Sequence, residues 1–167
     1  SKQERWDEAL DECRIAVELA PTAAEFHFNL GNALSAAEDW SEAAAEFQRA
    51  TDLAPGNADA HANFGIALYR LNRPEQAEAA HQIATELRPD SAHIWANLAS
   101  AHVDLGDPDA ALKACRRALE LDPDLPEAHN SVGLALNAKG LHEEAIAAYE
   151  TAIRLRPHYH KAYNNLG

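Results

Sequence analysis

The chain is poor in the residues that mark disulfide-rich and thiol-dependent proteins. Only 2 of its 167 residues are cysteines, and neither Cys13 nor Cys115 lies in a CxxC or other ligand-spaced motif. Both stand in apolar stretches with helical spacing, where a small buried residue is the ordinary role. We therefore expect no disulfide and no reactive thiol.

Basic residues and long apolar runs are also scarce. The 14 Lys and Arg stand against 27 Asp and Glu, and no basic run is longer than Arg116-Arg117. Nucleic acid is not expected as a partner, because phosphate neutralisation requires clustered cations. No apolar run approaches the roughly 18 residues of a membrane span, so no membrane partner is expected either. Nothing in the sequence names a compartment, and the cytoplasm is our default expectation.

Aromatic residues, glycine and proline are limited too, and each limit favours helices over sheets. Aromatics make up 7% of the chain, beside 7 Gly and 8 Pro, whereas the apolar fraction of 47% is rich in alanine. Alanine is the strongest helix former, and sheets rely on β-branched and aromatic residues. The composition predicts an all-α chain.

Five of the eight prolines recur every 34 residues: Pro21, Pro55, Pro89, Pro123 and Pro157. A leucine lies two residues before each of them, and alanines lie five and twelve residues before each. A fixed period of this length indicates a solenoid of stacked units in place of one globular core.

Each period contains two runs of apolar residues at helical spacing, which predicts a helical hairpin. Asp39 and Asp107 stand where they can cap the second helix of their units, and Pro108 stands at its first position. The recurring proline ends each second helix, because it cannot donate to the backbone ladder. Small residues at Gly31, Gly65, Ala99 and Gly133 would let the two helices approach closely.

These features resemble the tetratricopeptide repeat (TPR) family, whose pattern has a Leu-Gly pair in the first helix, two alanines and an aromatic in the second, and a closing proline. The resemblance implies an all-α, right-handed superhelical solenoid over the whole chain. It assigns a second helix to residues 1–23, complete units to 24–57, 58–91, 92–125 and 126–159, and a truncated first helix to 160–167. We expect the chain to be part of a longer solenoid.

The sequence departs from the family pattern at two positions. Histidines His27, His61 and His129 replace the usual opening tryptophan, which Trp95 keeps. His81 and Cys115 replace the second-helix aromatic. From these substitutions we expect a somewhat less densely packed middle.

The resemblance also implies that the first helices line a concave groove, which would contain a ladder of asparagines: Asn29, Asn63, Asn97 and Asn165, interrupted by Ser131. An amide can pair with both the C=O and the N–H of an extended peptide. Two roles remain open for these side chains: contact with a peptide backbone, or hydrogen bonds that tie neighbouring first helices together.

Further groove positions are predicted from helical spacing. They comprise polar contacts and side-chain pockets for a protein or peptide partner: Asn32, Phe28, Ile66, Tyr69, Arg70, His93, Val103, Asn130 and Leu134. The groove differs from that of repeats that clamp the acidic tails of heat-shock chaperones. Asn32 and Asn63 match the asparagines of that clamp, but its cations fall on Phe28, His93 and Asn97, which cannot make charge-assisted bonds to a carboxylate.

No cofactor, metal or catalytic chemistry is predicted. The nine histidines contain no His-x3-His pair, and equivalent ones should lie about 8–10 Å apart, too far to share a zinc ion. Glycine-rich phosphate loops and the GxSxG motif are absent from the sequence. We therefore expect a scaffold that binds a peptide and is not an enzyme.

Two alternatives of other classes stay open. The final stretch, EAIAAYETAIRLRPHYHKAYNNLG, is similar to repeats that precede the catalytic domain of O-linked N-acetylglucosamine transferases, which would make the chain the substrate-recruiting arm of a larger enzyme. End-to-end self-association through exposed repeat ends is the other alternative.

Overall fold

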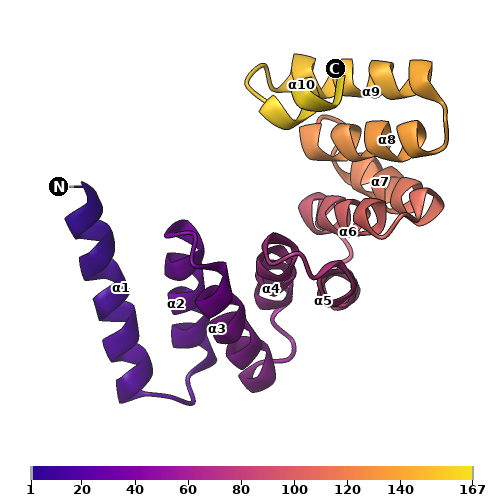
Figure 1. Ribbon diagram of the computed structural model, residues 1–167. Coiled ribbons are helices and arrows are strands. Elements are labelled where there is room, and N and C mark those ends of the chain that lie inside the picture. Colours follow the sequence, from indigo (N-terminus) through magenta and orange to yellow (C-terminus); the bar gives the residue numbers. More distant parts are fainter. Residues whose placement is uncertain (1, 167) are drawn as a thin grey trace. The chain divides into compact units, whose positions relative to one another are not determined.

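The computed structural model describes residues 2–166, and the side chains from residue 10 onward. Over these residues the chain forms ten α-helices (Figure 1). Their bounds are α1 Lys2–Leu19, α2 Ala24–Ala36, α3 Trp40–Leu53, α4 Ala58–Arg70, α5 Pro74–Leu87, α6 Ala92–Asp104, α7 Pro108–Leu121, α8 Pro126–Ala138, α9 His142–Leu155 and α10 His160–Leu166. The even-numbered helices are the first helices of the hairpins. The all-α prediction is confirmed.

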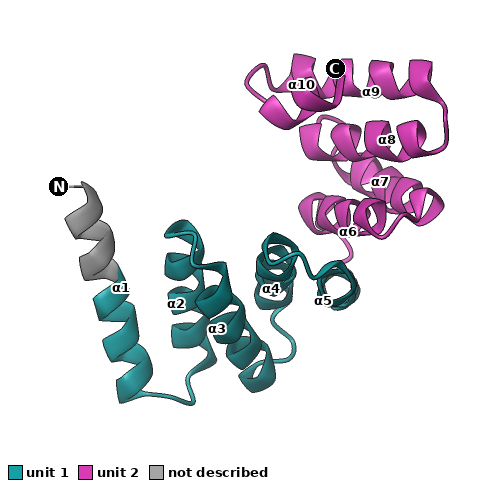
Figure 2. Cartoon of the chain, viewed as in Figure 1, with its two compact units in different colours: residues 1–87 teal, residues 88–167 magenta. Residues whose placement is uncertain are grey.

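The chain divides into two compact units, residues 1–87 with α1–α5 and residues 88–167 with α6–α10 (Figure 2). Within each unit every helix packs against the next one along the chain. Consecutive first helices also touch, α2 with α4 in one unit, and α6 with α8 and α8 with α10 in the other. This division was not predicted from the regular repeat.

The turn inside each hairpin has the same backbone conformation in four successive repeats. Glu38, Asn72, Gly106 and Gly140, spaced by 34 residues, all have positive φ angles between 57° and 77°. The residue after each donates its N–H five residues back, as from Asp39 to the Leu34 carbonyl at 3.0 Å. This is a Schellman cap, which satisfies the last carbonyls of the first helix and reverses the chain.

The second helices begin and end where the sequence predicts. The Asp39 carboxylate accepts from the Glu42 N–H at 3.1 Å, and the Asp107 carboxylate accepts from the Ala110 N–H at 3.0 Å. Pro108 occupies the first turn of α7. Each second helix from α3 onward ends two residues before the recurring proline. The predicted caps are therefore confirmed.

Alanine and glycine bring the two helices of a hairpin together. Ala43 and Ala50 of α3 are fully buried, as are their counterparts in α5 and α7. A Cβ added to Gly31 would lie 2.7 Å from the ring of Phe47, and one added to Gly65 would lie 2.5 Å from the ring of His81. His81, at 2% exposure, is as buried as Phe47, at 1%. The change from aromatic to histidine therefore does not open this position to solvent.

Candidate functional site

The predicted asparagine ladder contains hydrogen bonds between neighbouring first helices. In unit 1, Asn63 of α4 donates from Nδ2 to Oδ1 of Asn32 in α2, at 2.8 Å. Ser100 of α6 and Ser131 of α8 occupy the same two repeat positions in unit 2, and their hydroxyl oxygens lie 3.1 Å apart. The same pair of positions thus links adjacent first helices in both units.

The last repeat makes this link through another residue. Leu134 stands at the position of Asn32 and Ser100, and its side chain has no polar atom. Asn165 of α10 donates from Nδ2 to Oδ1 of Asn130 in α8, at 3.0 Å. Asn63 and Asn165 therefore tie helices together, which was one of the two roles left open. Each amide still has a second N–H and its own oxygen.

One predicted site residue is buried and another is half-buried against the core. Asn130 is only 5% exposed, and Ala62 and Ala96, at the same repeat position, are buried as well. Phe28, the fourth member of this set, is half-buried and packs against the core of unit 1, with its ring centroid 6.0 Å from that of Phe47. This position lies three residues before the buried Gly31 or its counterpart, and residues at that spacing share a helix face. The burial of Asn130 contradicts the prediction that it contacts a ligand in the groove, whereas the role of the half-buried Phe28 stays a prediction.

The remaining predicted residues stay accessible to different degrees. Asn29, Arg70, His93 and Asn165 are exposed, whereas Asn32, Asn63, Ile66, Asn97, Val103 and Leu134 are half-buried. Tyr69 packs against a cluster formed by Leu68, Ala77 and Ala80. The Arg70 guanidinium lies 4.9 Å from the ring centroid of Trp40, in cation–π contact. Arg70 and Tyr69 thus have structural contacts of their own.

The three histidines that replace the opening tryptophan make the same hydrogen bond as the tryptophan, to the carbonyl of the proline six residues earlier. Trp95 donates its indole N–H to the carbonyl of Pro89 at 3.0 Å. The Nε2 atoms of His27, His61 and His129 lie 2.9, 3.0 and 2.8 Å from the carbonyls of Pro21, Pro55 and Pro123. A carbonyl can only accept, so each Nε2 carries the proton. The sequence signal was a constant spacing of six residues between ring and proline.

His27 has a second partner that the other two histidines lack at the equivalent position. Its Nδ1 lies 2.6 Å from Oε2 of Glu46 in α3, and the histidine side chain is 3% exposed. At the position of Glu46, the repeat of His61 has Ala80 in α5 and the repeat of His129 has Ala148 in α9. Neither alanine side chain can accept a hydrogen bond. Both nitrogens of His27 face acceptors, and both bonds form when the ring carries two protons.

No group of three or more His, Cys, Asp or Glu side chains that could hold a metal ion occurs among the described residues. Across residues 2–166, no helix combines the length and apolar character that crossing a membrane would require.

The tetratricopeptide repeat family model matches residues 1–58, 63–126 and 99–160. No curated protein sequence matches the chain. YrrB, described as a TPR protein with an unusual peptide-binding site, is 26% identical, with a TM-score of 0.80 over 98% of this chain and 84% of YrrB.

Two MamA structures share the fold at lower identity. One is 22% identical with a TM-score of 0.83, over 96% of this chain and 94% of MamA. MamA of Desulfovibrio magneticus RS-1 is 20% identical with a TM-score of 0.82, over 95% of this chain and 89% of that chain. The family match extends over nearly the whole sequence and agrees with the observed hairpins. The chain belongs to the tetratricopeptide repeat family.

Proposed function

We propose that the chain is a protein-interaction scaffold that binds an extended segment of a partner along its first helices and catalyses no reaction itself. Membership of the TPR family supports a scaffold role, and YrrB, which has a similar fold, is described as peptide-binding. The observation that carries the proposal is the recurrence of accessible amides at one repeat position, at Asn29 and Asn63 in unit 1 and at Asn97 and Asn165 in unit 2.

The chemistry of these amides suits a peptide backbone better than a particular side chain. Asn63 uses one N–H for Asn32, which fixes the orientation of the group and leaves its other N–H and its oxygen for a ligand. An amide that is already oriented loses less rotational freedom on binding. The internal hydrogen bonds and peptide contact are therefore compatible roles of one side chain.

Asn29→Ala and Asn97→Ala test the proposal without removing a hydrogen bond described above. Peptides selected from a displayed random library against the full chain would be synthesised and titrated against both variants. We expect each substitution to weaken binding about 5- to 10-fold, because one such bond contributes about 1 kcal/mol. Gln82→Ala, on the exposed side of the second helix α5, is the matched control.

If the asparagines pair with the peptide backbone, the bound peptide must have free backbone N–H groups opposite them. Methylating single peptide nitrogens of a selected peptide should weaken binding at the positions that face an asparagine. If both asparagine variants bind as tightly as the unmodified chain, and methylation has no effect, the proposed amide contacts do not exist.

A further inference from the structure

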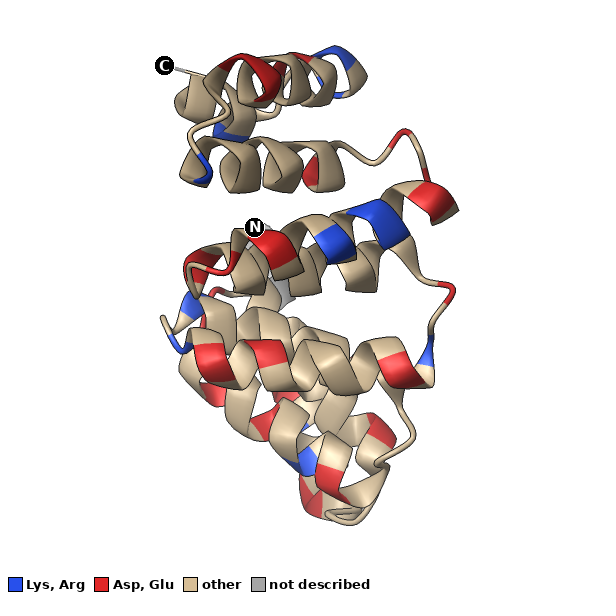
Figure 3. Ribbon diagram, turned by 90° about the vertical axis from the view of Figure 1, so that its right-hand side faces the viewer, with Lys and Arg blue, Asp and Glu red and all other residues tan. Residues whose placement is uncertain are grey.

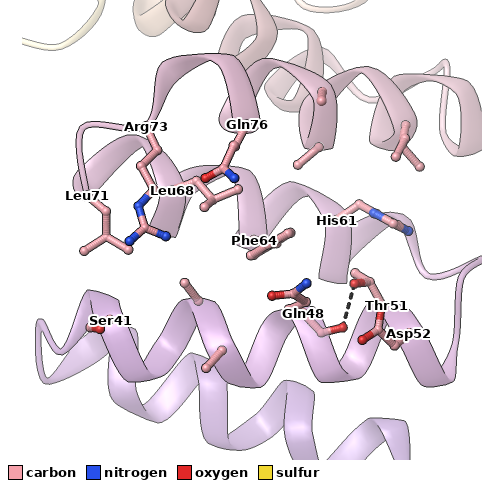
Figure 4. Close-up of a pocket in the computed structure, with 15 residues that line it drawn as sticks. Ser41, Gln48, Thr51, Asp52, His61, Phe64, Leu68, Leu71, Arg73 and Gln76 are labelled. Carbon is pink, nitrogen blue, oxygen red and sulfur yellow. Dashed lines mark hydrogen bonds between the residues drawn. The ribbon is translucent and has the colours of Figure 1, made fainter.

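Unit 1 contains a hollow on the side of the second helices, away from the predicted groove positions. It has a volume of about 490 Å³ and is bounded by α3, α4 and α5 (Figure 4). We call it the α3–α5 hollow. All 15 residues that line it belong to residues 41–83 of unit 1, so one compact unit builds the whole site.

Short side chains explain why this space is open. Alanines Ala44 and Ala45 form part of the α3 wall, and Ala79 and Ala80 form part of the α5 wall. The floor is apolar, because Phe64 and Leu68 of α4 line it between the two walls. Ala45 and Ala79 are exposed, so longer side chains at these positions would close the space without disturbing the core.

The polar groups of the hollow lie at its ends and on its walls. Arg73 lies at one end and Asp52 at the other (Figure 4). Gln48 of α3 and Gln76 of α5 both point into the space between them. Two amides on opposite walls can pair with the backbone of a bound chain, and two opposite charges at the ends give a ligand a direction.

The length of the hollow and its amides suit an extended chain better than a helix. Ser41 and Asp52 line the hollow from positions eleven residues apart in α3, which corresponds to about 16 Å at 1.5 Å per residue. A helix uses its backbone N–H and C=O groups internally, whereas an extended chain leaves them free to pair with Gln48 and Gln76. An extended chain covers the same length with about five residues.

The charge of the surrounding unit favours a basic ligand. Residues 1–87 contain 16 Asp and Glu against 6 Lys and Arg, and acidic positions are spread over many helices whereas basic ones are few (Figure 3). Such an excess attracts cations at long range and speeds their association. Within the hollow, Asp52 is the acceptor that a ligand cation would meet.

We propose that the α3–α5 hollow is a second binding site, which takes an extended basic segment of a protein partner. An apolar side chain of the segment lies on Phe64 and Leu68, Gln48 and Gln76 pair with its backbone, and a Lys or Arg about two to three residues away pairs with Asp52. Arg73 excludes a second cation from the opposite end. The inference is independent of the proposed binding along the first helices.

Unit 2 provides an internal comparison. Its hollow at the same repeat positions is lined by Leu112, Arg116, Leu119, Glu120 and Val132 from α7 and α8. Leucines there replace Ala44 and Thr51, Arg116 replaces Gln48, and Glu120 stands at the position of Asp52. The volume, about 460 Å³, is similar, so the difference that disfavours the same basic segment is the cation Arg116 in place of the Gln48 amide.

The test uses a displayed library of random decapeptides selected against the full chain. Synthetic copies of the selected peptides are titrated against Ala79→Trp and Ala45→Trp, which fill the hollow from opposite walls, and against Asp52→Lys. We expect one group of peptides to lose at least tenfold in affinity with all three variants. Its members should share an apolar residue two to three positions from a Lys or Arg.

Ala147→Trp is the matched control, because Ala147 is exposed in α9 at the same repeat position as Ala79; this variant should bind the same group of peptides normally. Circular dichroism and the thermal midpoint establish that each variant is folded. The proposal fails if no selected peptide distinguishes the unmodified chain from both tryptophan variants. It also fails if the peptides that do so become helical when bound, because the backbone of a helix has no free groups to pair with Gln48 and Gln76.

Discussion

The ring of Tyr149 in α9 lies directly against the backbone of Gly133 in α8, so closely that a Cβ on the glycine would lie 2.4 Å from Tyr149 Cε1. The neighbouring repeat of unit 2 has Ala99 and Cys115 at the same two positions, both fully buried. A larger residue on the first helix is thus matched by a smaller one on the second. Because protein interiors are close-packed, the size of one partner limits the other.

Gly133→Ala should therefore destabilise unit 2. The new methyl group would force the Tyr149 ring or the helix to move, and overpacking of this kind costs about 1–3 kcal/mol. The better helix propensity of alanine offsets up to about 1 kcal/mol of that cost. Urea unfolding followed by circular dichroism would measure the net loss.

A double variant separates overpacking from other effects of the alanine. Gly133→Ala combined with Tyr149→Cys reproduces the Ala99 and Cys115 pair, so the double variant should be more stable than the sum of the two single changes predicts. Strictly additive changes would contradict the matched-size explanation.

The buried imidazole of His81 predicts a loss of stability in mild acid. Burial lowers the pKa of His81 from 6.5 to about 4, and Nδ1 has no hydrogen-bond partner among the described residues. Between these two pKa values the unfolded chain binds a proton that the folded chain does not, so stability falls as the pH decreases. Over the whole window the loss is about 3 kcal/mol.

His81→Phe isolates this contribution, because Phe47 already occupies the equivalent position opposite Gly31. Between pH 6.5 and pH 5 the unmodified chain should lose about 2 kcal/mol relative to the variant. Urea unfolding at several pH values gives the free energy of unfolding of both proteins. If it changes with pH in parallel for the two, protonation of His81 does not destabilise the fold.

The left-handed residue Glu38 offers a stabilising substitution. It has a φ of 62° where the third and fourth complete repeats have Gly106 and Gly140, and this conformation costs a non-glycine residue about 1–2 kcal/mol. After the greater entropy of glycine in the unfolded state is subtracted, Glu38→Gly should raise stability by up to about 1 kcal/mol.

Asn72→Gly is its matched control, since Asn72 has a φ of 57° in the equivalent turn. Asparagine tolerates the left-handed region better than glutamate, so the gain should be smaller. Thermal unfolding of both variants compares the two gains in stability. A larger gain for Asn72→Gly than for Glu38→Gly would contradict the explanation by left-handed strain.

The two cysteines should differ in reactivity. Cys115 is fully buried, and burial raises the pKa of its thiol to about 12, whereas Cys13 is partly exposed. Only thiolates react readily with disulfide reagents. Titration with such a reagent should modify Cys13 alone in the native chain and both in urea. Native modification of Cys115 at a comparable rate would show that the interior of unit 2 opens readily.

The sequence predicts the backbone of this protein far better than the contacts of its side chains. The period of Pro55 and its counterparts, and the caps at Asp39 and Asp107, depend on local geometry and were confirmed. Asn130 lies three residues before the buried Gly133, on the same face of α8, and the groove prediction overlooked this spacing. The histidine bonds to the proline carbonyls were missed for another reason. The change from tryptophan to histidine was interpreted only as a change in packing, although the tryptophan position also supplies an N–H donor.

The bond from an aromatic N–H to the proline carbonyl has an evolutionary consequence. Indole in Trp95 and imidazole in His61 reach the same acceptor at the same 3.0 Å, although the two rings differ in size. The joint between successive repeats therefore constrains one donor atom and leaves the rest of the ring free to change. At this contact, a unit that opens with tryptophan and one that opens with histidine are equivalent, so one array can contain both kinds of joint.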